Sequence, residues 1–556
     1  MCKFIFVTGG VISGCGKGIS AASIGLLLKM RGEKVQIIKF DPYLNISAST
    51  LSPYQHGECW VCDDGSETDL DLGHYERITG IEVGSKNICT SGTLFSSIFD
   101  EDREGKYLGE TIQIHPHVTN KINDTLMNLG KESDIVICEI GGTVGDLESG
   151  HFMMAIQQIR QRMGGDNVLI VHVAPILWQN TIGEFKTKPL QKSIIELQRF
   201  GIQPDILLCR TSQPVQDKVL VKVSELTGVS REAVFEAPDV SSVYQVPISF
   251  YDRHVDDLIA DKFHLRRTGV RIHKYRDLVE KYIAATDMPD ITVGIIGKYT
   301  AVSDAYISLK EAIYHASVSN NTRTNIRWIE ASKLEECQTI RGMAKHFENV
   351  DCIIVPGGFD IRGVEGKMKA IQYVREKKIP FLGICLGLQC AVIEFARNVC
   401  GIDNANSEEF KKGNKDITPL VHFIEGQQNI KKKSGTLRLG AYDCELTKDS
   451  LAASVYKKRE CSERHRHRYE VNSEYSDLLS KKGFHVSGTN PETGLIEIME
   501  LDRSLHPYFI GTQAHPEFKS RLGYAAPLFH SLISAAMDKK QISRKMDSES
   551  TLKEGE

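Results

Sequence analysis

The stretch at residues 4–20, FIFVTGGVISGCGKGIS, constrains this chain more than any other. It opens with an apolar run as long as one buried strand, continues through five glycines and Lys17, and leads into a helical pattern at 21–28. Backbone N–H groups and the positive end of such a helix bind phosphate, and the lysine adds a mobile charge. The stretch therefore predicts a nucleotide phosphate site between a strand and a helix.

This loop departs from the standard phosphate loop in two ways. Five residues separate Gly10 from Gly16 where the standard loop has four, and Gly18 stands where Ser or Thr would hold magnesium. A metal ligand must therefore come from elsewhere. Acidic residues at 63–71 and Glu139, at the end of an apolar strand pattern, supply the carboxylate oxygens that such a cation prefers.

Composition describes an ordinary globular protein of more than one domain. The 556 residues are too many for one core, 41% are hydrophobic and 25% charged, and the net charge of −4 gives no pull toward nucleic acid or membrane. No apolar run approaches the ~20 residues of a membrane span. The 14 cysteines are scattered, and the chain starts directly on a strand pattern without room for a signal peptide. We expect a cytoplasmic protein.

Strand and helix patterns alternate along both halves of the chain. Apolar strand patterns at 34–40, 134–139, 168–173 and 205–209 are separated by helical ones, and a second series starts at 291–296. A basic stretch ending in Met288-Pro289-Asp290 lies between the two series. We expect an α/β protein with two doubly wound, mostly parallel sheets. The predicted parts are domains at 1–265 and 291–540, a linker at 266–290 and a flexible polar tail at 541–556.

A second chemical signature reads PFLGICLGLQ at 380–389. An apolar strand turns into a helix at Cys385, with glycines two residues before and two after it, as in a nucleophile elbow with sulfur in place of a hydroxyl. The helix start favours a thiolate and an oxyanion. His515 and Glu517 follow a later strand and supply the base and the orienting acid that such a nucleophile needs.

Several other patterns leave alternatives open. Cys59 and Cys62, with His56 nearby, form either a zinc site or ordinary packing, and the lack of a second pair favours packing. Lys186 and Lys188 lie either in a solvated loop or in a second anion site. The basic stretch at 464–468 lacks interleaved aromatic residues, which argues against nucleic acid, and one of its arginines fits a small carboxylate. Residues 431–433 read as a surface loop.

Together these signatures resemble the CTP synthase family over residues 1–540. The matching motifs are VTGGVISGCGKG, DPYLN, DLDLGHYER, EIGGTVGDLES, GEFKTKP, PGGF, GICLG, ERHRHRYEVN and HPEF, and the second half alone resembles class I glutamine amidotransferases. This sequence departs from the family pattern at Ser47, Ser49 and Leu190.

The resemblance implies a carbon–nitrogen ligase that aminates UTP to CTP with ammonia from glutamine, at the expense of ATP. In the implied reaction, ATP phosphorylates the uracil 4-oxygen and ammonia displaces the phosphate. The resemblance further implies Mg²⁺, activation by GTP, feedback inhibition by CTP, and a homotetramer built as a dimer of dimers. The sequence leaves filament formation open.

The resemblance also assigns site residues. The implied catalytic triad is Cys385, His515 and Glu517, and the implied metal ligands are Asp71 and Glu139. Implied ATP contacts are Gly14, Cys15, Gly16, Lys17, Gly18, Ile19, Lys39, Asp71, Asp239 and Val240. Implied UTP or CTP contacts are Ser13, Asp146, Leu147, Glu148, Lys186, Thr187, Lys188, Pro189, Leu190, Gln191 and Lys222. Implied glutamine contacts are Gly358, Leu386, Gly387, Leu388, Gln389, Glu409 and Arg468.

Two other functions compete with this interpretation. Cobyrinate-type amidases also join a nucleotide domain to a glutaminase, but the GEFKTKP and DLDLGHYER segments resemble CTP synthases alone. A regulatory or assembly-forming protein without activity would have replaced Lys17, Glu139 or Cys385, and all three are present.

Overall fold

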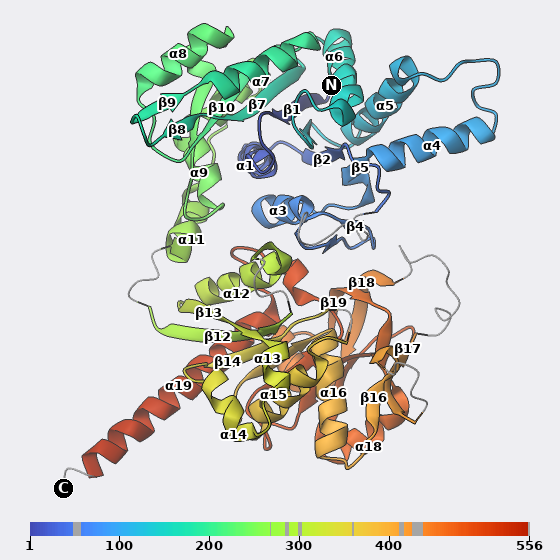
Figure 1. Cartoon of the computed structure of the whole chain (residues 1–556), viewed down its shortest axis with the longest axis vertical. Helices are drawn as coiled ribbons and strands as arrows, with labels where there is room; N and C mark the ends of the chain where they lie inside the picture. Colours follow the sequence, from blue (N-terminus) through green and yellow to red (C-terminus); the bar gives the residue numbers. More distant parts are fainter. Residues whose placement is uncertain are drawn as a thin grey trace. The chain divides into compact units, whose positions relative to one another are not determined.

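The computed structural model describes residues 1–47, 57–266, 268–283, 288–298, 303–358, 361–410, 416–424 and 437–553. The chain folds into two compact units (Figure 1). The first unit comprises Met1–Thr50 and Leu70–Ile283, and the second comprises Leu51–Asp69 and Ala284–Glu556. Among the described residues, no helix combines the length and the apolar character needed to cross a membrane.

The first unit is built on a seven-stranded sheet in which all strands run parallel. The order β11-β10-β7-β1-β6-β2-β5 places β1, which precedes the glycine loop, near the middle. The strands are β1 Lys3–Gly9, β2 Val35–Asp41, β5 Ile88–Thr90, β6 Ile135–Ile140, β7 Val168–Pro175, β10 Ile206–Thr211 and β11 Val234–Pro238.

Helices cover both faces of this sheet, which explains why its strands are continuous apolar runs. Gly25 of α1 packs against Ile37 and Ile137 on one face. Phe4 and Phe6 point to the other face, where helices α5 and α6 complete a core. The helices are α1 Lys17–Met30, α3 Leu70–Thr79, α4 Ser91–Arg103, α5 Thr119–Gly130, α6 Gly150–Met163, α7 Lys188–Arg199, α8 Asp217–Thr227, α9 Gln245–Asp252, α10 Val255–Lys262 and α11 His273–Ile283.

The second unit is built on a nine-stranded mixed sheet with the order β13-β12-β14-β15-β23-β22-β21-β18-β19. Its first five strands run parallel and the remaining pairs are antiparallel. The strands are β12 Asp290–Gly297, β13 Arg323–Glu330, β14 Cys352–Val355, β15 Phe381–Ile384, β18 Arg438–Leu446, β19 Glu460–His467, β21 Phe484–Thr489, β22 Ile496–Leu501 and β23 Phe509–Thr512. A small sheet joins β16 Ala405–Ser407, β17 Thr418–Phe423 and β20 Tyr469–Val471.

Alternate residues of this sheet enter two separate cores. Ile353 and Val355 of β14 pack with residues of α15 and α16, whereas Ile354 packs with residues of α12 and α19 on the other face. The helices are α12 Ile307–Ser319, α13 Ala331–Glu335, α14 Ile340–Met343, α15 Val364–Glu376, α16 Leu386–Asn398, α17 Leu451–Tyr456, α18 Ser476–Ser480 and α19 Pro527–Lys553. The predicted α/β class is confirmed: the first sheet is parallel throughout, and the second is parallel over its first five strands and antiparallel beyond them.

A short hairpin from the first part of the sequence belongs to the second unit. Its strands are β3 Trp60–Val61 and β4 Glu67–Thr68. The Trp60 ring is buried against Phe518, with ring centroids 5.1 Å apart. Asp63 accepts a hydrogen bond from the Arg464 guanidinium, and Glu67 accepts one of 2.9 Å from Arg466. Two carboxylates of the acidic stretch therefore pair with arginines.

The CxxC motif lies in the same hairpin. Burial raises the pKa of the Cys59 thiol to about 12, and Cys62 is buried as well. His56 lies outside the described residues, as do residues 431–433. Within the described parts of the chain, no group of three or more His, Cys, Asp or Glu side chains is placed to hold a metal ion.

Two helices occupy stretches that the sequence assigns to linker and tail. α11 lies within the expected linker at 266–290. This stretch is helical because its apolar side, which includes the buried Val279, packs on the first unit. α19 continues to Lys553, through most of 541–556. The domain limits from the sequence stay a prediction.

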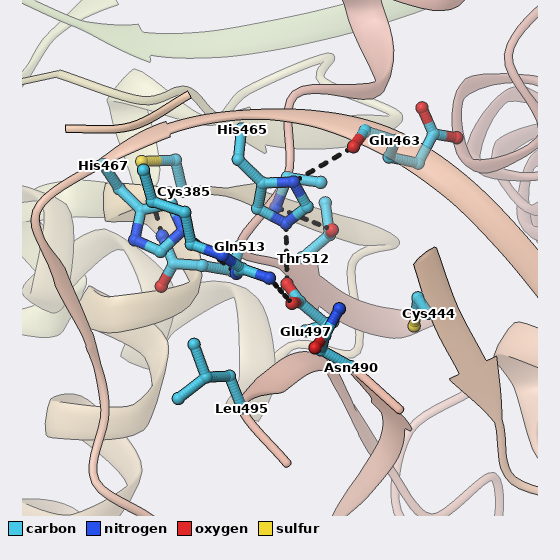
Figure 2. A network of polar contacts seen from close by, with 12 residues as sticks. Cys385, Cys444, Glu463, His465, His467, Asn490, Leu495, Glu497, Thr512 and Gln513 are labelled. Atoms are coloured by element: carbon cyan, nitrogen blue, oxygen red, sulfur yellow. Dashed lines mark hydrogen bonds and ion pairs between the residues drawn. The ribbon is translucent and has the colours of Figure 1, made fainter. Parts of the chain in front are cut away.

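A buried ion pair holds three strands of the second unit together. Glu497 on β22 bonds the Arg438 guanidinium of β18 and His465 of β19, both at 2.6 Å. Figure 2 shows the contact between Glu497 and His465. Burial alone would raise the pKa of Glu497, but His465 and Arg438 outweigh it and hold the value at about 2. The stability that this carboxylate contributes is therefore complete above its ordinary pKa of 4.5 and is lost as the pH falls toward about 2.

We expect Glu497→Gln to lower the free energy of unfolding of the second unit by about 3 kcal/mol, because it leaves the buried Arg438 charge without its counter-ion. Chemical denaturation at pH 7 measures this change. The control is Glu365→Gln, which removes the partner of Arg397 at the surface and should cost less than about 1 kcal/mol. Equal effects of the two substitutions would contradict the prediction.

Candidate active sites of the two units

The glycine loop of the first unit ends at a helix without a side-chain cap. Gly16 is the N-cap residue of α1 with a left-handed φ of 88°, and this cap makes no side-chain hydrogen bond to the helix start. A helix start of this kind presents free N–H donors and a positive dipole end to an anion. Lys17 is buried beside it, and its Nζ donates a 2.8 Å hydrogen bond to the Gly142 carbonyl.

Two carboxylates meet directly beside this loop. A Cβ atom added to Gly18 would lie 2.7 Å from Asp71 Oδ1 and 3.1 Å from Glu139 Oε2. Burial and the charge of Asp71 raise the pKa of Glu139 to about 7, although Lys39 and Lys17 lower it. Lys39 bonds Asp71, and the Tyr75 hydroxyl donates to Glu139. A divalent cation would relieve the repulsion between the carboxylates, so the donor set fits magnesium.

A pocket of about 200 Å³ opens at the same helix start. Arg210 forms part of its wall, where its guanidinium bonds the carbonyls of Ala237 and Pro238. The lining residues are Gly16, Ile19, Ser20, Arg210, Ala237, Pro238, Asp239, Val240, Val243, Val246, Ser249 and Phe250. The predicted ATP contacts Gly16, Ile19, Asp239 and Val240 thus share one pocket beside the phosphate loop.

The predicted UTP residues form a less compact set. Lys186 bonds Glu184 at 2.8 Å, and Lys222 also acts on this carboxylate, so the two lysines lie close together. α7 begins at Lys188, directly after Thr187. The Asp146 carboxylate accepts the Thr143 N–H.

Three members of this set present very different surfaces. The Leu147 side chain is 92% exposed and Ser13 is exposed as well, whereas Leu190 is fully buried at 0%. Leu190 therefore presents no exposed surface to a ligand. These assignments stay predictions.

The cysteine of the second unit lies at a strained turn. Cys385 has φ 52° and ψ −105° between the end of β15 and the start of α16. A Cβ atom on Gly387 would lie 2.0 Å from the Val355 carbonyl oxygen, so the helix approaches β14 only because this residue is glycine. Leu386 and Gly387 are the first residues of α16, so their N–H groups have no acceptor within the helix. Donors of this kind are suited to stabilise an oxyanion.

His515 joins the cysteine to the acid. Its Nδ1 lies 2.7 Å from Glu517 Oε1. A Cβ atom on Gly357 would lie 3.4 Å from both His515 Nε2 and Cys385 Cβ, which places the second ring nitrogen at the cysteine. Burial lowers the pKa of His515, but Glu517 and hydrogen bonding with Cys385 outweigh burial and raise it to about 10. The imidazole therefore carries a proton at neutral pH, as in a thiolate–imidazolium pair.

The predicted glutamine contacts surround Tyr469. Gln389 Nε2 donates to the Tyr469 carbonyl at 2.9 Å. Burial raises the pKa of the Tyr469 hydroxyl, with Glu409 raising and Arg468 lowering it, so both charged groups lie near this ring. A Cβ atom on Gly358 would lie 3.8 Å from Leu386, whereas Leu388 is buried in the core. Leu388 therefore presents no exposed surface to a substrate.

Sequence reasoning missed four residues of these sites. Arg210 and Tyr75 support the first site, as described above. Lys367 of α15 is 1% exposed and donates a 3.0 Å hydrogen bond to the Pro356 carbonyl, just before Gly357; burial lowers its pKa to about 8. Gln513 contacts the sulfur of Cys385. Each is a single polar residue in a helix, in a strand or directly after one, and only the position of Gln513, two residues before His515, gave a signal.

Comparison with known proteins covers both units. Residues 3–265 match the family model of the CTP synthase N-terminus, and residues 301–535 match that of class I glutamine amidotransferases. A CTP synthase of Methanococcus maripaludis is 49% identical over 97% of this chain and 100% of its own length. A CTP synthase of Carboxydothermus hydrogenoformans is 47% identical over 97% of this chain and 99% of its own.

Among solved structures, the glutaminase domain of Trypanosoma brucei CTPS with bound acivicin is 36% identical, with a TM-score of 0.41. The match covers 45% of this chain and 94% of the Trypanosoma brucei domain. The two full-length relatives decide the assignment: the chain belongs to the CTP synthase family.

Proposed function

We propose that this protein is a glutamine-hydrolysing CTP synthase, which aminates UTP to CTP at the expense of ATP. One observation carries the proposal: a single chain holds a cysteine–histidine–glutamate site in one unit and a phosphate loop with paired carboxylates in the other. Family membership over the full length supports the same activity, and it disfavours an amidase acting on another acceptor.

In the second unit, the chemistry begins at the sulfur of Cys385. The thiolate attacks the side-chain amide carbon of glutamine, and the electron pair of the carbonyl moves to oxygen, where the N–H groups at the start of α16 stabilise it. His515 gives its proton to the amide nitrogen, so that ammonia leaves and a thioester remains. Water, deprotonated by His515, then releases glutamate. Glu517 holds the ring tautomer with Nδ1–H toward itself.

In the first unit, the chemistry is phosphoryl transfer followed by displacement. The uracil 4-oxygen of UTP attacks the γ-phosphorus of ATP, and ADP leaves. Ammonia adds to the C4 carbon and expels phosphate to give CTP. Lys17 and the N–H groups at the start of α1 neutralise the charge on the transferring phosphoryl group.

The remaining ligands are assigned to residues already described. The pocket lined by Arg210, Asp239 and Val240 would take the ATP base. Asp71 and Glu139 would hold Mg²⁺, which would supply positive charge to offset the charge of the nucleotide phosphates. Lys186, Lys188 and Lys222 would bind the UTP triphosphate. We further propose activation by GTP, feedback by CTP, a cytoplasmic location and a homotetramer, on the basis of the family.

The first test separates the two sites. We expect Cys385→Ala to reduce CTP formation from glutamine more than about a thousandfold, because the nucleophile is lost, and to leave CTP formation from added ammonia unchanged. Chromatography of nucleotides after incubation with UTP, ATP and magnesium measures both rates. Cys390→Ala, a buried cysteine of the same helix, is the control. A parallel loss of both activities would overturn the division of labour.

The second test addresses the phosphate loop. Lys17→Ala should lower CTP formation from glutamine and from ammonia alike, by about a hundredfold, since both need the phosphorylated uracil. Hydrolysis of glutamine by the second unit should survive. Lys29→Ala, in the last turn of the same helix, serves as the control and should retain activity. Undiminished ammonia-dependent synthesis in Lys17→Ala would exclude the role given to this lysine.

The third test uses the pH dependence of glutamine hydrolysis. Glu517 and Cys385 hold the pKa of His515 at about 10, so Glu517→Gln should let it fall toward its ordinary 6.5. The proton that the leaving ammonia needs is then lost at lower pH. We expect the alkaline limb of the kcat/KM profile for glutamine to shift downward and the maximum to fall at least about tenfold. A variant profile that keeps the alkaline limb of the original protein would contradict this assignment.

A further inference from the structure

Gln513 lies between Cys385 and the buried ion pair of Glu497 and Arg438. It directly follows β23 and is 0% exposed. Its backbone N–H donates a 2.7 Å hydrogen bond to the Glu497 carbonyl, and the Glu497 side chain is fixed by Arg438 and His465 (Figure 2). The backbone of Gln513 is therefore held by its hydrogen bond to β22.

The side chain of Gln513 reaches the nucleophile. Its Nε2 donates a hydrogen bond to Cys385 Sγ at 3.5 Å, a usual separation for a nitrogen donor and sulfur. The preceding residue, Thr512, accepts the Cys385 backbone N–H at 2.7 Å. Two consecutive residues thus bond the backbone and the sulfur of the same cysteine, which fixes the distance between amide and thiol.

The neighbouring side chain determines which end of the amide faces the sulfur. The Tyr469 carbonyl can only accept, so the atom of Gln389 that lies 2.9 Å from it is the nitrogen. The same nitrogen lies 3.1 Å from Gln513, which must therefore present its oxygen there. The NH₂ group of Gln513 is left to face Cys385, so the sulfur meets a donor.

The other groups at the sulfur explain why a donor matters. The Arg466 carbonyl oxygen lies 3.9 Å from Cys385 Sγ and accepts a hydrogen bond from the thiol. Once the thiol proton has moved to His515, this carbonyl offers nothing to a thiolate. The amide of Gln513 carries no charge and does not titrate, so it donates to the thiolate at every pH. A hydrogen bond to an ionised partner favours that ionised form.

The geometry points to Gln513 as a fourth catalytic residue of the glutaminase site: its amide N–H binds the Cys385 thiolate and directs it toward the substrate. This role rests on the glutamine chemistry proposed above and extends it to a residue outside the Cys–His–Glu set. If Gln513 only filled space, a residue of the same size would replace it without loss of activity. If it is catalytic, activity requires its N–H donor.

Two substitutions separate these roles. Gln513→Glu keeps the size and replaces the donor by a carboxylate that repels a thiolate, and Gln513→Met keeps the length and removes all polarity. We expect both to slow alkylation of Cys385 by iodoacetamide at pH 7 by about tenfold, the glutamate variant more than the methionine variant. Mass spectrometry of the peptide that contains Cys385 distinguishes this thiol from the other thirteen of the 14 cysteines.

Steady-state kinetics on the full chain give the second readout. For both variants we expect kcat for glutamine hydrolysis to fall about tenfold or more while KM for glutamine changes less than about threefold, because the donor acts on the nucleophile. CTP formation from ammonia should be unchanged. The control is Gln372→Met on α15, whose amide bonds Glu376 and which should match the original protein in every assay.

Three results would overturn the inference. One is alkylation of Cys385 in Gln513→Met at the original rate. Another is a Gln513→Glu variant that alkylates and turns over like the original protein, which would show that size alone matters. The third is a loss of kcat that follows the fall in melting temperature across both variants with alkylation unchanged. Absence of glutamine hydrolysis in the original protein would instead contradict the proposed function, and the alkylation assay still tests the role of Gln513.

Discussion

Unpaired backbone N–H groups at a helix start, directly after a buried parallel strand, are the interaction on which both sites depend. α1 follows β1 through the glycine loop, and α16 follows β15 through Cys385 alone. In each case the sheet fixes where the helix begins, and the first N–H groups of the helix are donors suited to an anion. In the proposed function, the start of a helix therefore binds the nucleotide phosphate in one unit and stabilises the oxyanion of the amide substrate in the other.

Around these helix starts, buried charges are arranged so that each has a partner or a task. Asp71 and Glu139 repel one another beside Gly18, which suits a cation. Glu517 raises the pKa of His515, which keeps a proton available for ammonia to leave with. Arg438 and His465 keep the Glu497 carboxylate ionised. The Glu497 carbonyl accepts the Gln513 backbone N–H and so positions Gln513 beside the sulfur of Cys385. The same carboxylate therefore contributes to stability and positions a catalytic side chain.

The hairpin of β3 and β4 shows how the sequence order and the folded units differ. Trp60, Asp63 and Glu67 pack on residues that follow them by about four hundred positions, because Arg464 and Arg466 on β19 pair with the two carboxylates. Asp71, three residues after the end of β4, lies in the first unit. A run of acidic residues that reads as one loop in the sequence is divided between the ion pairs of Asp63 and Glu67 in the second unit and Asp71 in the first, for which we propose a role in binding magnesium.

The sequence by itself determined the α/β class, the strand-then-helix context of Lys17 and Cys385, and the residue types of both sites, because apolar periodicity and glycine spacing are local properties. It also placed Asp71, Glu139, His515 and Glu517 as candidates through their motifs. Only the tertiary structure decided that Asp63 and Glu67 face arginines, that α11 and α19 extend into the expected linker and tail, and that Gln513 and Lys367 reach the glutaminase site. Those outcomes depend on contacts between residues far apart in the chain, which no local pattern records.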